Sequence, residues 1–192
     1  MPLDILSSPS IGPRLAPVEH RHAPLFCLAL LTVCCVLASF ALACATPFAA
    51  FAVVAAAMLP IRPAAIVVAC AWLVNQAIGF GALHYPIDGD TALWGLTIGA
   101  SALVATAIAA ATLRILPRHR TPLALALALL CAYGAYEVTL LAATPFLGGA
   151  GGFTTAIIAR LGFLNFAWLI AIVAACEIVR LLNPLRRRHA VS

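Results

Sequence analysis

Most residues of this 192-residue sequence that could take part in chemistry lie inside long apolar stretches. Polar side chains are costly inside a bilayer and usually face a cavity or another helix, so their positions mark candidate sites. Trp72, Asn75 and Gln76 have the i, i+3, i+4 spacing of one helix face, and Phe80 and His84 continue it. The two amides either bridge neighbouring helices by hydrogen bonds or hold a ligand.

A second group of polar and aromatic residues follows later in the chain. Tyr133 and Glu137 also share a helix face. Glu137 lies inside an apolar stretch, where an ionisable side chain needs a partner. Arg160 is the nearest cation on the following stretch, so Glu137 is either half of a structural ion pair or an anchor for a ligand. The predicted ligand-binding set is Trp72, Asn75, Gln76, Phe80, His84, Trp94, Tyr133, Tyr136, Glu137, Arg160 and Asn165.

Metal and cofactor chemistry has little support in the sequence. His84 is the one candidate metal ligand, with Asp88 and Asp90 nearby, although a lone histidine is more often a solvated surface residue. The seven cysteines form no CxxC motif, so they are interpreted as small packing residues, with Cys70 and Cys131 the better placed as soft metal ligands. We expect no bound cofactor and, without a nucleophile–base pair or metal triad, no enzymatic activity.

These residues must be positioned by membrane-spanning helices. The chain is 65% hydrophobic and 9% charged, whereas a soluble domain has about 45–50% apolar and about 25% charged residues. This composition excludes a soluble globule, a disordered chain and a nucleic-acid-binding module. It predicts an all-α membrane protein, and six apolar stretches can be recognised: residues 24–45, 47–59, 64–83, 91–116, 122–143 and 157–182.

The second stretch is short, and it is either a sixth span or a re-entrant segment. Charge decides between them, because cytoplasmic loops are enriched in Arg and Lys. With six spans, every arginine except Arg160 falls on one side of the membrane, and with a re-entrant segment that bias is lost. We therefore predict six spans in a bacterial cytoplasmic membrane, with both termini inside.

Three regions follow from this division: a mobile cytoplasmic arm over residues 1–23, a six-helix domain over residues 24–185 and a basic tail over residues 186–192. Four glycines between residues 148 and 152 predict a mobile lid between the last two spans. The spacing of Ala41, Ala45 and Ala49 predicts a small-residue face on which another membrane subunit docks.

Six spans in a short chain, small-residue faces and polar groups gathered toward the outer loops resemble the substrate-binding S components of energy-coupling-factor transporters. The resemblance lies in the architecture of residues 24–185 and in no residue-level motif. It implies a vitamin, a cofactor precursor such as a cobalamin, or a transition metal as substrate. It also implies a transmembrane coupling subunit and two cytoplasmic ATPases as partners.

The expected function is thus a membrane-embedded substrate-binding subunit of an uptake system, with a pocket that opens outward. The alternative is a structural or assembly subunit of a larger membrane complex, without a ligand site. That alternative predicts that Asn75, Gln76 and Glu137 are all paired between helices.

Overall fold

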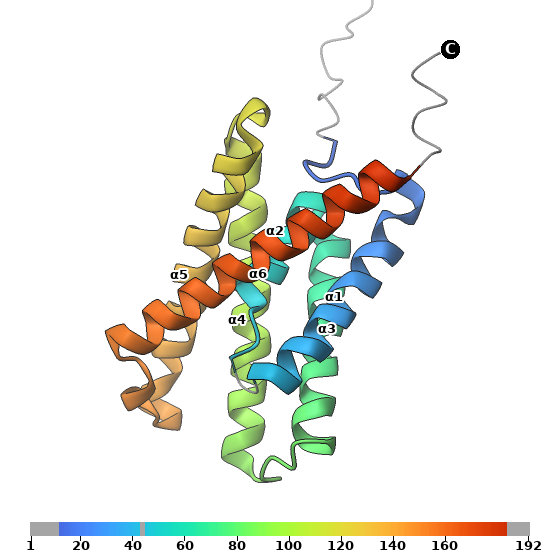
Figure 1. Cartoon of the computed structure of the whole chain (residues 1–192). Helices are drawn as coiled ribbons and strands as arrows, with labels where there is room; N and C mark the ends of the chain where they lie inside the picture. Colours follow the sequence, from blue (N-terminus) through green and yellow to red (C-terminus); the bar gives the residue numbers. More distant parts are fainter. Residues whose placement is uncertain (1–11, 43–44, 184–192) are drawn as a thin grey trace, which may run out of the picture.

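The computed structural model describes residues 12–42 and 45–183, which fold into α-helices and short 3-10 turns without a strand in these ranges (Figure 1). The α-helices are α1 (Ala23–Leu42), α2 (Phe48–Met58), α3 (Ile61–Gly81), α4 (Gly89–Ile115), α5 (Thr121–Leu147) and α6 (Thr155–Leu182). Turn η1 (His20–His22) leads into α1, η3 (Arg118–Arg120) into α5, and η4 (Ala150–Gly152) lies between α5 and α6.

Five of these helices are long and apolar enough to cross a membrane: α1, α3, α4, α5 and α6. The protein is therefore a helical membrane protein by length and composition. The structure differs from the predicted six full spans at α2. This helix has 11 residues and extends only about 16 Å, whereas the hydrocarbon core of a bilayer is about 30 Å thick. Its boundaries at Pro47 and Leu59–Pro60 match the predicted stretch.

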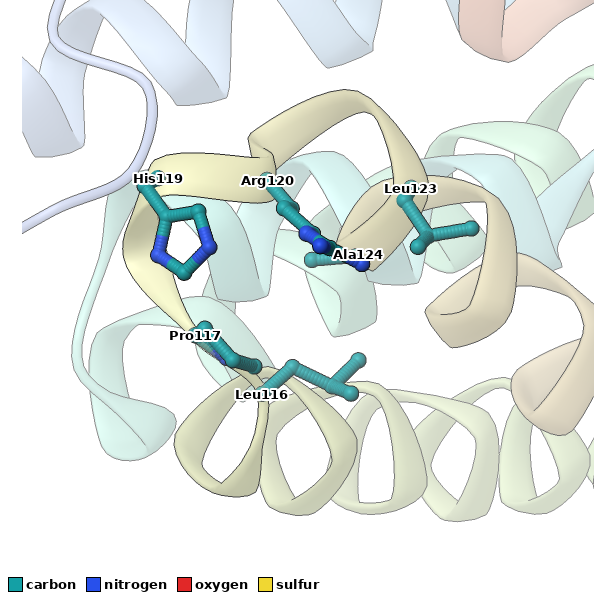
Figure 2. Close-up of a pocket in the computed structure, with 6 residues that line it drawn as sticks. All are labelled: Leu116, Pro117, His119, Arg120, Leu123 and Ala124. Carbon is teal, nitrogen blue, oxygen red and sulfur yellow. The ribbon is translucent and has the colours of Figure 1, made fainter.

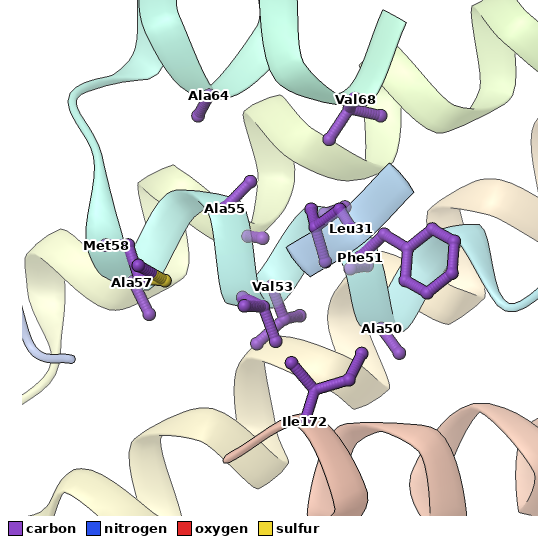
Figure 3. Close-up of a cluster of buried hydrophobic side chains, with 14 of the residues drawn as sticks. Leu31, Ala50, Phe51, Val53, Ala55, Ala57, Met58, Ala64, Val68 and Ile172 are labelled. Atoms are coloured by element: carbon purple, nitrogen blue, oxygen red, sulfur yellow. The ribbon is translucent and has the colours of Figure 1, made fainter. Parts of the chain in front are cut away.

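Helix α2 forms the centre of the bundle. Its sequence is apolar on every side, and a helix of this kind is stable only when it is surrounded. It contacts each of the other five α-helices, and all of its residues except Ala56 are buried. Phe51 makes edge-to-face contacts with Phe48 and with Trp168 of α6, and Val53 faces Ile172 (Figure 3).

Small residues allow the long helices to approach closely. Helices α4 and α5 bury facing alanines, and such residues bring helix backbones together. Gly95 and Gly99 of α4 leave room for α3: a Cβ on Gly95 would lie 2.5 Å from Gln76 Oε1, and one on Gly99 would lie 2.7 Å from the Trp72 ring. The small residues of α4 therefore act inside the bundle.

The two ends of the bundle differ in charge. The start of α1, the α4–α5 turn and the end of α6 lie at one end, and the α3–α4 and α5–α6 connections lie at the other (Figure 1). All described arginines except Arg160 belong to segments at the first end, which we call the basic end. The short α2 does not turn back, because residues 45–46 and 56–60 line cavities at opposite ends.

Residues 12–22 pack against the basic end, where a mobile arm was expected over residues 1–23. The backbone N–H groups of Arg14 and Leu15 donate to the carbonyl of Ala57, at 2.8 and 3.1 Å, and Leu15 is buried. The Arg14 guanidinium donates to the carbonyls of Leu113, Leu116 and Pro117 at the end of α4. Residues 1–11 and the predicted basic tail at 186–192 lie outside the described residues.

Candidate functional site

The predicted polar residues separate into a hydrogen-bonded network and a cavity. In the network, Asn75 Nδ2 of α3 donates to Ser39 Oγ of α1 and to Thr46 Oγ1, both at 2.9 Å. Gln76 Nε2 donates to Asn75 Oδ1 at 3.3 Å. These bonds connect α1, α3 and the segment before α2. Asn75 therefore bridges neighbouring segments, which is the first of the two roles predicted for the amides.

Trp72 is also committed to helix packing. Its ring fills the space above Gly99, and its indole N–H donates to the carbonyl of Gly95 at 2.8 Å. With its only polar group paired and its ring against α4, Trp72 fixes the distance between α3 and α4. Neither Trp72 nor the two amides of α3 line the cavity described next.

A cavity of about 120 Å³ lies at the end opposite the basic end. Four of the predicted ligand-binding residues line it from three helices: Trp94 of α4, Tyr136 and Glu137 of α5, and Asn165 of α6. The rest of its wall is Ala45, Thr46, Ile98, Leu140 and Leu161. We call it the Trp94 cavity.

Glu137 is the unusual member of the Trp94 cavity. Its Oε1 is buried and accepts no hydrogen bond, and it is the one described side-chain oxygen or nitrogen in that condition. Arg160 does not fill this role, because its side chain is exposed and no ion pair joins it to Glu137 among the described residues. Glu177 of α6, by contrast, is paired with Arg180 at 2.5 Å.

Tyr133, one turn before Glu137, lies outside the lining. Its hydroxyl donates to the carbonyl of Ile158 in α6 at 2.6 Å. Its ring packs over Gly162, where a Cβ would lie 3.1 Å from the ring. Tyr133 therefore joins α5 to α6, and its side chain also interacts with that of Glu137.

Asn165 has a structural role that sequence spacing does not reveal. Its Oδ1 accepts a hydrogen bond from the backbone N–H of Ala50, at 3.0 Å, and its Nδ2 donates to the carbonyl of Leu161, also at 3.0 Å. Ala50 lies in the first turn of α2, where backbone N–H groups have no acceptor within the helix. Asn165 of α6 thus caps the central helix and lines the Trp94 cavity at once.

The glycine-rich connection between α5 and α6 touches the wall of the cavity. Gly148 and Gly149 adopt φ values of 73° and 81°, a region that suits glycine. A Cβ on Gly149 would lie 3.3 Å from Trp94 Cζ2, so the connection rests against the indole ring. Any movement of this connection changes the space around Trp94.

The remaining predicted ligand residues do not join the Trp94 cavity. Phe80 is half-buried at the end of α3, and His84 is exposed in the α3–α4 connection with a φ of 57°. Asp88 accepts a hydrogen bond from Thr91 N at 2.7 Å and caps α4, and this bond lowers the pKa of its carboxyl. No three His, Cys, Asp or Glu residues of the described chain lie close enough to hold a metal ion together.

The alanine face predicted for partner docking is not continuous. Helix α1 ends at Leu42, so Ala41 lies on α1, Ala45 lies between helices, and Ala49 lies on α2. Ala41 is exposed, but Ala49 is only 1% exposed, inside the core. The break at Pro47 ended the helical periodicity on which the prediction relied.

Two features lay outside the sequence prediction. One is a hollow of about 350 Å³ at the α4–α5 turn, where Leu116, Arg120 and Leu123 surround an opening beside His119 (Figure 2). The other is a larger cavity lined by Arg14, Arg114 and Arg118. Both depend on how the arm and the turns pack, which residue spacing does not encode.

The cysteines in the described ranges are all free thiols. Cys27, Cys34, Cys35 and Cys176 are buried in the core, as expected for packing residues, and Cys35 donates to the carbonyl of Ala71 at 3.1 Å. Cys70 and Cys131 are on different helices, α3 and α5, and neither lines the Trp94 cavity. Cys44 lies outside the described residues.

The arrangement at the Trp94 cavity offers an unsatisfied carboxylate oxygen between two aromatic residues and a capping amide. It offers no nucleophile activated by a neighbouring base within the lining. Chemically, it is suited to holding a small polar group. Comparisons with protein-family models, with curated proteins and with solved structures find no match to this chain.

Proposed function

We propose that this protein is a membrane-embedded binding subunit that captures a small organic molecule in the Trp94 cavity for uptake. The observation that carries the proposal is Glu137 Oε1, buried beside a cavity without a hydrogen-bond partner. Leaving such an oxygen unpaired costs free energy, and buried polar groups without partners are rare. A ligand that donates to Glu137 would remove that cost.

The lining indicates the chemistry of the ligand. Glu137 is the one carboxylate among the lining residues, which include no Arg, Lys or His. Trp94 and Tyr136 are the aromatic residues of the lining. A carboxylate makes its strongest hydrogen bonds with cationic donors, and aromatic faces attract cations. We therefore favour a ligand with a protonated or N–H-bearing nitrogen, such as an amine-containing vitamin or cofactor precursor.

The size of the cavity adds a constraint. Pockets for drug-sized ligands measure about 300–1,000 Å³, whereas the Trp94 cavity holds about 120 Å³. It accommodates one functional group of such a ligand. The rest would need the space opened by movement of the glycine-rich connection, residues 148–152, which rests on Trp94. This supports the lid role for that connection.

The transport context of the proposal rests on the resemblance to S components. We place the basic end in the cytoplasm of a bacterium, with both termini inside, because arginines collect on the cytoplasmic side. The Trp94 cavity then faces outward. A transmembrane coupling subunit with cytoplasmic ATPases would supply the energy. Reporter-enzyme fusions after Ser192 and within residues 149–151 test this orientation, since only the second should report the outer side.

Binding by Glu137 is tested with purified protein and a panel of water-soluble vitamins that includes amines and their uncharged analogues. We expect saturable binding of an amine and a loss of affinity of about 10- to 100-fold in Glu137→Gln, the range for a hydrogen bond to a charged group. Glu177→Gln is the matched control, because Glu177 is paired with Arg180. Absence of saturable binding across the panel, together with no small molecule in mass spectra of the purified protein, would refute the proposal.

The alternative, an assembly subunit, is favoured by one observation. Asn75 and Trp72 satisfy their polar groups between helices, as expected for a purely structural core. Under this alternative, Glu137→Gln would lower the cost of the buried oxygen that has no hydrogen bond, and it would raise thermal stability without changing any ligand binding. The same protein preparations distinguish the two functions, because only the binding subunit loses affinity for an amine.

A further inference from the structure

A second cavity, at the basic end, is larger and opposite in character. It measures about 710 Å³ and lies between residues 12–14, the ends of α2 and α4, and the start of α3. We call it the basic cavity. Arg14, Arg114, Arg118 and His20 are among the described residues that line it, and none of those lining residues is acidic. The nearest carboxylate on the arm, Glu19, is outside the lining and is paired with Arg21 at 2.9 Å.

The helix C-termini that face the basic cavity are already capped. The last turn of a helix leaves carbonyl groups free and carries partial negative charge, which disfavours an anion. Here the Arg14 guanidinium donates to Leu113 O of α4 and to the carbonyl of Leu116, the residue that follows α4. The backbone N–H groups of Arg14 and Leu15 bond to Ala57 O of α2. The arm thus offsets the negative ends of both helices.

Other donors around the basic cavity remain available. Arg114 is exposed, and the described part of the chain gives it no hydrogen bond or ion pair. Arg118 uses one terminal nitrogen to donate to Gly12 O and keeps its other N–H groups. Helix α3 begins at Ile61 in the wall of the cavity, and the first turn of a helix carries partial positive charge that attracts an anion. Its first-turn N–H donors are those of Ile61 and Arg62, because Pro63 has none and Ala64 N donates to Pro60 O.

Arg14 and Arg118 also lie close enough to repel each other. Partial burial and the neighbouring charge of Arg118 lower the pKa of Arg14 from its ordinary value. The Arg14 guanidinium stays protonated, since the ordinary pKa of an arginine is far above neutral pH. An anion between the two arginines would therefore relieve the repulsion and bond to several N–H groups at once.

We propose that the basic cavity binds a phosphate group, held by Arg114, Arg118 and the N-terminus of α3, with Arg14 as the residue that closes the cavity and caps α4. The bidentate geometry of guanidinium matches phosphate oxygens, and the volume exceeds what a bare inorganic ion needs. Two sources carry this chemistry. One is the headgroup of an anionic phospholipid at the membrane surface, and the other is a soluble phosphate compound.

The test uses the full chain in nanodiscs of phosphatidylcholine. In one arm, cardiolipin or phosphatidylglycerol is added to the bilayer, and lipid retention is measured by native mass spectrometry after release. In the other arm, inorganic pyrophosphate is titrated into phosphatidylcholine nanodiscs, and the melting temperature is followed. Preferential retention of the anionic lipid identifies a lipid site, and saturable stabilisation by pyrophosphate alone identifies a soluble ligand.

Arg114→Gln and Arg118→Gln are the decisive variants. A basic residue near an anionic surface contributes about fivefold in affinity, so we expect about a fivefold loss for each variant and about a 25-fold loss for both together. Replacement of both by lysine should restore only part of the pyrophosphate stabilisation, because the charge returns without the bidentate geometry of the guanidinium groups. Arg160→Gln, at the opposite end, is the matched control and should leave both readouts unchanged.

Three results would overturn the proposal: no preference for anionic lipid together with no pyrophosphate effect, an equal loss in Arg160→Gln, or undiminished binding in the double glutamine variant. If the double variant does not fold, Arg114→Gln alone decides, because Arg114 makes no described bond that folding requires.

Discussion

Replacement of Asn165 by alanine tests how the central helix is held. In the wild-type protein, Asn165 Oδ1 accepts from Ala50 N at 3.0 Å. Asn165→Ala removes that acceptor, and Ala50 is completely buried in the wild-type protein. The variant therefore leaves an unpaired N–H at the start of α2, inside the protein.

The expected loss of stability is about 2 kcal/mol. Removing a cap from an exposed helix costs about 1 kcal/mol, and leaving a buried donor unsatisfied costs about 1–3 kcal/mol. Interhelical hydrogen bonds in membranes average only about 0.6 kcal/mol, because the separated helices find other partners. The N–H of Ala50 lies in the first helical turn and has no such partner within α2, so we place the cost above that average.

The assay is reversible unfolding in mixed micelles, with the free energy of unfolding followed by circular dichroism across a titration of sodium dodecyl sulfate. Thr112→Ala is the control: Thr112 is also a polar residue of a long helix, but it bonds only within α4, to Ile108 O at 2.9 Å. We expect less than about 0.5 kcal/mol there. If Asn165→Ala lowered the free energy of unfolding by no more than the control does, the capping role of Asn165 would be refuted.

Two further predictions concern α4. Gly99→Ala should lower the free energy of unfolding by about 1–3 kcal/mol, because the added Cβ would lie 2.7 Å from the Trp72 ring, whereas Gly81→Ala, with nothing within 4 Å, should have little effect in the same unfolding assay. Asp88 should titrate below the ordinary value of about 3.9, because its carboxylate accepts from Thr91 N. The capping contribution of Asp88 is then present above the unfolded-state pKa and is lost as the pH falls through the lower folded-state pKa. A carboxyl carbon resonance of Asp88 with a midpoint at or above the ordinary value would contradict this.

The helical class and the approximate helix positions followed from hydrophobicity. Bilayer-length apolar stretches must form helices to pair their backbone groups, so five long helices were predictable. The predicted break at Pro47 was also correct, but the docking face of Ala41, Ala45 and Ala49 ignored it. Helical spacing has no meaning across a break in the helix, so the three alanines do not form one continuous face.

The candidate site was predictable only in part. Trp94, Tyr136, Glu137 and Asn165 line one cavity. Their expected depths in the apolar stretches are similar, and residues at the same depth on neighbouring helices lie near each other. Depth does not tell which way a helix face points. Trp72 and Asn75 therefore appeared to belong to the same site, although they are turned toward α4 and α1.

The sequence by itself determined a helical membrane protein with its arginines concentrated at one end, because hydrophobicity and charge act residue by residue. Only the tertiary structure decided the rest. It placed the short α2 at the centre, capped by a side chain from α6, and it left Glu137 without the Arg160 partner that sequence proximity suggested. It also packed residues 12–14 against the basic cavity, which is lined by Arg14, Arg114 and Arg118. These outcomes depend on which surfaces of distant helices meet, and such contacts follow from packing of the whole chain.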